Sequence, residues 1–107
     1  MITIKDILPV GVEHNGKVHR DFELRPAKLL DNIEAIEELG DQAASALRLG
    51  TAILARQIVS IGDIPRELIT TDFVYQLLDV DYDALEKARE SLQKKLIPPK
   101  APSKKPE

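Results

Sequence analysis

The dipeptide Asn15-Gly16 constrains the fold most strongly, because it lies between two runs of β-prone residues. Asn-Gly supplies two consecutive residues that tolerate positive φ angles, as a tight hairpin turn requires. The chain is therefore expected to begin with a β-hairpin. A two-residue turn would place Val18 opposite Glu13, whereas a three-residue loop over residues 14–16 would place Val18 opposite Val12.

The three-residue loop gathers more apolar side chains on one face of the hairpin, because it also sets Phe22 opposite Leu8. We therefore predict this register, with Gly16 in the left-handed conformation. The other face of the hairpin is then polar and solvated, and it carries His19, Asp21 and Glu23.

A first helix is expected after the hairpin. It begins near Pro26, whose fixed φ suits the first helical position, and it stops at Gly40. Its apolar residues recur on one stripe at helical spacing: Leu29, Leu30, Ile33, Ile36 and Leu39. Its other side is acidic or polar: Asp31, Asn32, Glu34, Glu37 and Glu38.

Three more helices are expected. The second, capped by Asp41, runs to about Ile61 and is apolar on two sides: Leu47, Thr51, Leu54, Ile58 and Ile61 on one, and Leu49, Ala52 and Ile53 on the other. The third is short, is capped by Thr70 or Thr71, and ends near Leu78. The last runs from about Asp83 to Leu96, with Leu85, Ala88, Leu92 and Leu96 on one stripe.

The predicted architecture is α+β: an N-terminal β-hairpin packed on a bundle of about four helices. Residues 1–96 form a single domain. Residues 97–107 form a disordered tail, because four prolines and three lysines fall within residues 98–107.

Charge and composition narrow the classes of function. The net charge of −3 is uneven, since residues 94–107 hold five of the lysines and one glutamate, which leaves −7 on residues 1–93. An acidic body argues against nucleic acid as the main partner. The chain has no cysteine and no apolar run long enough for a membrane span, and its start does not resemble a signal peptide.

The polar motifs do not predict catalysis or a bound cofactor. Asp79, Asp81, Asp83 and Glu90 match the ligand spacing of a calcium-binding EF-hand loop, but Ala84 stands where that loop needs glycine. We expect Asp83 and Glu86 to cap the last helix instead. No serine is expected near a histidine, and His14 and His19 are expected to be exposed hairpin residues without a metal. The chain is therefore predicted not to be an enzyme.

The number of aliphatic residues leaves two interpretations open. Stripes on every helix, with a second apolar side on the helix around Leu49 and Ile53, either fill a monomeric bundle or exceed its core. In the second case the surplus would form an oligomer interface or a groove for an amphipathic partner helix.

Three segments, in this order, resemble the tail assembly chaperones of contractile-tailed, Mu-like phages and prophages. They are Phe22-Glu-Leu-Arg-Pro26 with Asp31 five residues on, the stretch from Ile53 to Ile64, and Asp81-Tyr-Asp-Ala-Leu85. The likeness spans about residues 15–95.

The resemblance implies a non-catalytic chaperone that binds the tape measure protein, assists tail tube subunits, and tends to self-associate. It also implies action in the host bacterial cytoplasm and absence from the finished virion. Partner or oligomer contacts are expected at Leu49, Ile53, Leu85, Leu92 and Leu96. A small regulatory adaptor, such as an antitoxin-like inhibitor, is the alternative.

Overall fold

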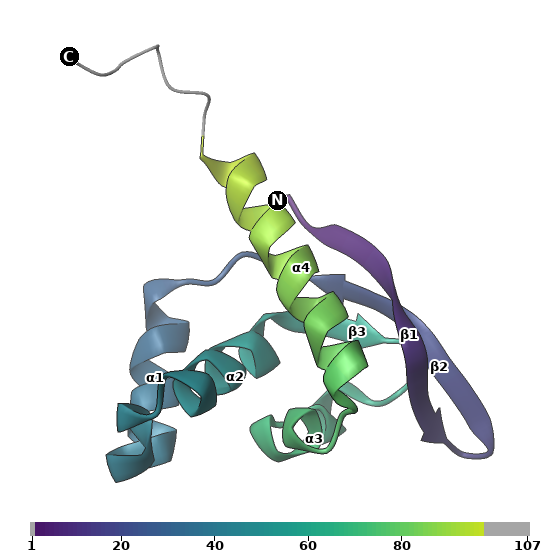
Figure 1. Ribbon diagram of the computed structural model, residues 1–107, viewed down its shortest axis with the longest axis horizontal. Helices are drawn as coiled ribbons and strands as arrows, with labels where there is room; N and C mark the ends of the chain where they lie inside the picture. The colour runs from purple at the N-terminus through teal and green to yellow at the C-terminus, as the bar shows by residue number, and fades with distance from the viewer. Residues whose placement is uncertain (1, 98–107) are drawn as a thin grey trace.

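The computed structural model describes residues 2–97, which form a three-stranded antiparallel sheet packed with helices (Figure 1). The strands follow the order β1-β2-β3 and comprise Ile4–His14, Lys17–Leu24 and Ile58–Ile61. The α-helices are α1 (Leu29–Leu39), α2 (Ala46–Gln57), α3 (Thr71–Tyr75) and α4 (Asp79–Leu96), with short 3₁₀ helices η1 (Gly40–Ala44) and η2 (Arg66–Leu68). The predicted α+β class is confirmed, whereas the predicted tail falls mostly on residues outside those described.

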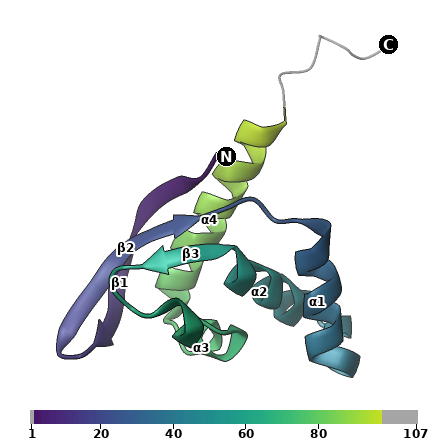
Figure 2. The same cartoon turned by 180° about the vertical axis from the view of Figure 1, so that it is seen from behind.

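The core lies where α4 crosses one face of the sheet, and in the opposite view the strands stand in front of that helix (Figure 2). Leu85, Ala88 and Leu92 of α4 are buried, as the predicted stripe requires, while Leu96 is 43% exposed. The other large, fully buried apolar side chains come from the strands, from α2 and from the residue after η2: Leu8, Phe22, Leu24, Leu54, Ile58, Ile61 and Ile69.

Three predicted helix starts are wrong, including those of the last and the first helix. The last helix begins at Asp79 rather than Asp83, so Asp83 and Glu86 lie inside it and do not form the expected capping box. The first begins at Leu29 rather than near Pro26, because the backbone N–H of Lys28 donates to the Asp31 carboxylate and caps the helix there.

The predicted hairpin register is also wrong. Glu13 pairs with Val18 and His14 with Lys17, so the turn has two residues, with positive φ at both Asn15 and Gly16. This turn type matches the right-handed twist of the strands, and that preference outweighs the apolar pairing that favoured the longer loop. As a result Val18 is 56% exposed and His19, expected on the solvated face, is buried.

A wide bulge in β1 shifts the register again. Ile7 pairs with Asp21 and Val12 with His19, so residues 8–11 face Arg20 alone. Pro9 has no N–H for the ladder. The backbone N–H groups of the next two residues, Val10 and Gly11, donate instead to the carboxylate of Asp81 on α4, at 2.8 and 3.0 Å. Asp81, only 1% exposed, thus ties α4 to the bulge.

The predicted second helix is two elements. It ends at Gln57, and Ile58–Ile61 leaves it as β3, pairing with β2 through Phe22 and Ile61. Three of these four residues are β-branched, and their apolar spacing suits a helix equally well over so short a run. The cap is Ser45 rather than Asp41, since η1 occupies residues 40–44.

We predict that Asp81→Asn lowers the free energy of unfolding by about 1–3 kcal/mol, because the amide cannot accept from both buried N–H groups. Asp83→Asn is the matched control, since it lies two residues on in the same helix and is exposed; its effect should stay within about 0.5 kcal/mol. Urea unfolding followed by circular dichroism measures both. Equal effects would contradict the role given to Asp81.

Candidate partner-binding surface

Helix α1 is packed with its charged side inward. Asp31 and Ala35 are its buried residues, whereas Leu29, Ile33 and Ile36 lie on the opposite side and are 76%, 43% and 49% exposed. Leu30, on the flank, is 56% exposed. We call Leu29, Leu30, Ile33 and Ile36 the α1 apolar face. The stripe predicted from the sequence is present, and of the two interpretations left open for the aliphatic residues, its exposure agrees with a surplus beyond the core.

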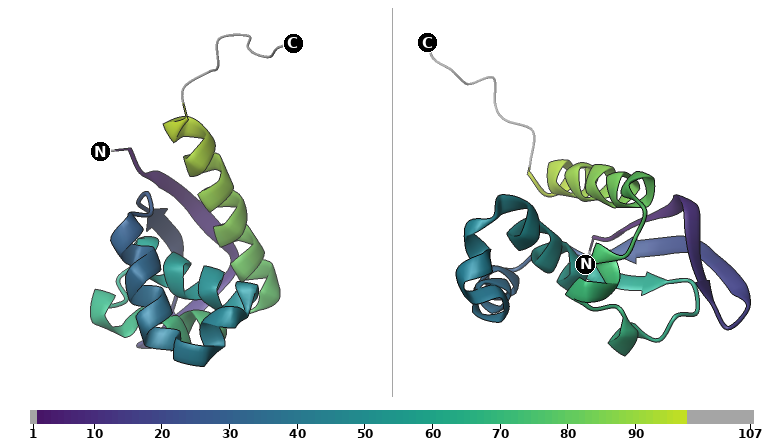
Figure 3. Two further views of the ribbon diagram at one scale, coloured as in Figure 1. Left: turned by 90° about the vertical axis from the view of Figure 1, so that its left-hand side faces the viewer. Right: turned by 60° about the horizontal axis from the view of Figure 1, so that its bottom comes forward.

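The position of α1 leaves this face open. Helix α1 packs on α2 at the end of the molecule away from the hairpin, with α2 on its inner side (Figure 3). Exposed aliphatic residues thus gather on α1, whereas on the central helix α2 Leu47 is exposed and Leu49 and Ile53 are half-buried.

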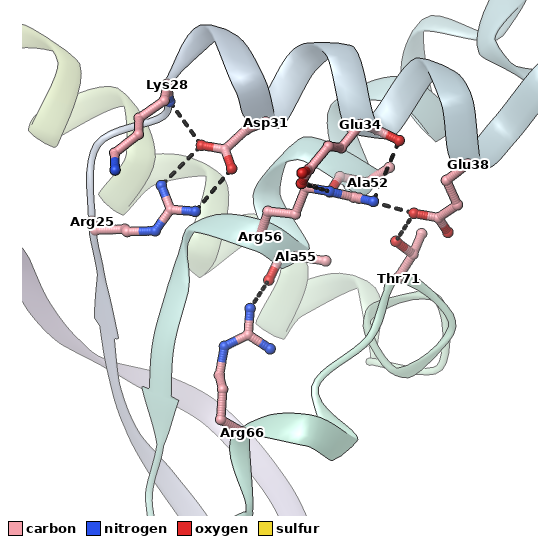
Figure 4. A network of polar contacts seen from close by, with 10 residues as sticks. All are labelled: Arg25, Lys28, Asp31, Glu34, Glu38, Ala52, Ala55, Arg56, Arg66 and Thr71. Atoms are coloured by element: carbon pink, nitrogen blue, oxygen red, sulfur yellow. Dashed lines mark hydrogen bonds and ion pairs between the residues drawn. The ribbon is translucent and has the colours of Figure 1, made fainter.

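An ion pair with two parallel hydrogen bonds holds the N-terminal end of α1. Arg25 donates from Nη1 and Nη2 to the two carboxylate oxygens of Asp31, both at 2.8 Å (Figure 4). The backbone of Arg25 is fixed in turn by Gln57, whose carbonyl accepts from Arg25 N and whose Nε2 donates to Arg25 O, both at 2.9 Å. Through these contacts with Asp31 and Gln57, Arg25 joins the end of β2 to the start of α1 and the end of α2.

The pKa values of the pair shift in the direction that favours both charges. The pKa of Asp31 lies below its ordinary 3.8, chiefly because Arg25 donates hydrogen bonds to the carboxylate, and partial burial opposes this. The pKa of Arg25 is raised, chiefly by the same hydrogen bonds. The Asp31 side chain is 7% exposed, so water screens this pair less than an ordinary surface pair.

A second, weaker cluster holds the middle of α1. Arg56 of α2 lies 2.9 Å from Glu38 and 3.6 Å from Glu34, and Thr71 at the start of α3 donates to Glu38 at 3.0 Å (Figure 4). Glu34 is 50% exposed and Glu38 is 39% exposed, so each ion pair contributes at most about 1 kcal/mol. The cluster mainly orients α1 on α2 and α3.

Below this cluster, Arg66 ties η2 to α2. It donates to the carbonyl of Ala55 at 3.0 Å (Figure 4). It also donates to the carbonyl of Ile69 at 2.7 Å. Burial lowers the pKa of Arg66, and the nearby charges of Arg25 and Arg56 add to that effect. Arg66 thus fixes the segment after β3, which carries α3 and Thr71 toward α1.

The contact residues expected from the sequence are scattered. Leu85 and Leu92 are in the core at 0% and 1% exposure, so the folded chain does not offer them to a partner. Leu49 and Ile53 are half-buried on α2, and only Leu96 is exposed. The α1 apolar face gathers exposed aliphatic residues on one side of a single helix, and the same spacing predicted that stripe.

The residues considered for metal binding do not converge. Asp79 to Glu90 are continuous α-helix rather than a loop. The rings of His14 and His19 lie 6.2 Å apart, and His19 Nδ1 accepts from the backbone N–H of Asp63. Over residues 2–97, no group of three or more histidine, aspartate or glutamate residues has the arrangement of a metal site.

Tyr82, within the Asp81–Leu85 motif, has a structural role. Its hydroxyl donates to Glu86 at 2.5 Å and accepts from Thr51 of α2 at 3.2 Å. Burial raises the pKa of Tyr82, and the hydrogen bond to Glu86 adds to the shift. Together with Asp81 it joins α4 to both β1 and α2.

Comparisons of this chain with protein-family models, with curated proteins and with solved structures found no match. Within the described part of the chain, no helix has the length and apolar character needed to cross a membrane.

We predict that Asp31→Asn lowers the free energy of unfolding by about 2 kcal/mol near neutral pH, because a buried charge-assisted pair is lost. The folded-state pKa of Asp31 is depressed, so its stabilisation is complete above the unfolded value near 3.8 and is lost as pH falls through the lower folded value. The difference in free energy of unfolding between wild type and variant should therefore become smaller in that acidic range. Urea unfolding at a series of pH values measures it.

Glu37→Gln is the control for this series, because Glu37 is an exposed α1 carboxylate with no ion pair among residues 2–97. Its effect should stay within about 0.5 kcal/mol at every pH. A gap for Asp31→Asn that widens toward acid would contradict the assignment.

Proposed function

We propose that the protein is a non-catalytic binding protein and that its α1 apolar face receives an amphipathic helix of a partner. The observation that carries this is the orientation of α1: its carboxylates are held by Arg25 and Arg56, while its aliphatic side chains face solvent. A contiguous exposed apolar surface on a small domain is typical of a protein-interaction site. Aliphatic residues at helical spacing suit a helix as partner.

Within this class we propose a tail assembly chaperone of the contractile-tailed phage type. The support is the resemblance of the ordered motifs, together with the positions of their residues. Arg25 and Asp31 of the first motif orient the α1 apolar face, and Asp81 and Leu85 of the last fasten α4 to the sheet. The proposed partner is the tape measure protein, with tail tube subunits assisted in turn, in the host cytoplasm and before the virion is complete.

We further propose that the same face pairs with a second copy when no partner is present. Antiparallel contact about a twofold axis near Ile33 would set Leu29 opposite Ile36 of the second copy. A twofold pair repeats each such contact, so the apolar faces of both copies are covered at once. Self-association of this kind keeps the apolar face covered until a tape measure helix replaces the second copy.

We predict that Ile33→Glu with Ile36→Glu abolishes both self-association and partner binding while the fold is retained. Both side chains are about half exposed and glutamate suits a helix, so the stability cost should be about 1 kcal/mol. Size-exclusion chromatography with light scattering measures the oligomer. Co-expression with a phage tape measure protein measures how much of that protein remains in the supernatant.

Val18→Glu is the matched control, because Val18 is 56% exposed on the hairpin, away from α1. It introduces one such carboxylate into the hairpin and should leave oligomer and partner binding unchanged. If the doubly substituted protein bound the tape measure protein as well as wild type does, the α1 apolar face would not be the binding surface.

A further inference from the structure

A polar groove of about 590 Å³ lies between α4 on one side and α1 and α2 on the other. Its lining includes Asn32 of α1, Ile53 and Gln57 of α2, and Asp83, Lys87 and Glu90 of α4. Asn32 lies four residues before Ile36 on α1, so the groove borders the α1 apolar face. A helix bound on that face would present one flank to the groove.

Gln57 in the lining has an unused hydrogen-bond acceptor. The side chain is 2% exposed, and its Nε2 donates to the carbonyl of Arg25. Its Oε1 is buried and has no hydrogen-bond partner among residues 2–97. Since Nε2 is fixed by a carbonyl acceptor, the amide cannot turn over to remedy this. A buried acceptor left in this state favours a donor that enters from outside.

The charges around the groove favour a cation. The Glu86 carboxylate already accepts from Arg89 at 2.7 Å and from Tyr82, and Arg89 also donates to Gly50 O. That leaves Asp83 and Glu90, with no ion pair in the described part of the chain, and Lys87 between them in the helix. These three groups carry a net charge of −1.

We propose that the groove binds the guanidinium of an arginine on the flank of the partner helix. A guanidinium has several donors in one plane and no acceptor, so its tip can donate to Gln57 Oε1 while other N–H groups meet Asp83 and Glu90. This inference rests on the proposed function, since the groove borders the α1 apolar face. It specifies the partner chemistry: an apolar stripe for the face and an arginine beside it for the groove.

The test titrates ethylguanidinium chloride into the ¹⁵N-labelled full chain, with sodium chloride at equal concentration as the reference. We expect a saturable shift of the Gln57 side-chain amide signals. The affinity should fall about threefold or more in the double variant Asp83→Asn, Glu90→Gln, and stay unchanged in Glu67→Gln, an exposed carboxylate outside the groove. Lys87→Met should raise the affinity, because it removes the resident cation.

No saturable shift at Gln57 would overturn the inference, as would equal affinity in the double variant and in Glu67→Gln. Neither result bears on the α1 apolar face, because the small cation does not use it. Conversely, if Ile33→Glu with Ile36→Glu leaves partner binding intact, the proposed function fails and the partner assignment of the groove fails with it, even where ethylguanidinium binds.

Discussion

The ion pair between Arg25 and Asp31 determines which side of α1 packs against the rest of the protein. The Asp31 carboxylate is 7% exposed and accepts hydrogen bonds from Nη1 and Nη2 of Arg25, so it is costly to separate from this partner. Helix α1 must therefore present this side inward. The exposed pairs of Arg56 with Glu34 and Glu38 only reinforce that choice. Once Asp31 and Ala35 are inward, helical geometry places Leu29, Ile33 and Ile36 outward. The exposed apolar face follows from an electrostatic contact.

The two ends of the molecule have different roles: one contains the core and the other carries the exposed apolar face. Asp81 and the α4 stripe close the core over the sheet, and they place Leu85 and Leu92 where no partner reaches them. Helix α1 lies at the other end of the molecule, on α2 (Figure 3). It carries the exposed apolar face, and the groove beside it lies between α1, α2 and α4. A stable core with a separate binding surface suits a protein that must bind and release a partner while it stays folded.

Much of the fold is predictable from the sequence. Several of the wrong predictions concern features that a local sequence pattern does not contain. Periodicity located α1, α4 and the Leu85–Ala88–Leu92 stripe, and Asn15-Gly16 located the hairpin. Periodicity does not say which side of a helix packs inward when a charged pair competes with an apolar stripe, so it left open whether the α1 stripe fills the core or exceeds it. Nor does it separate a four-residue strand such as Ile58–Ile61 from the helix before it. The bulge at residues 8–11 depends on Asp81, seventy residues away, and no local pattern contains that contact.

Site-specific photo-cross-linking tests the central claim most directly. A photoreactive benzoylphenylalanine at Ile33, on the α1 apolar face, is compared with one at Val59, which is 41% exposed on β3. Both variants are expressed with the tape measure protein and irradiated in cells. The account predicts a cross-link to that protein, or to a second copy of the chain, from position 33 and none from position 59. Cross-links from position 59, with none from position 33, would contradict it.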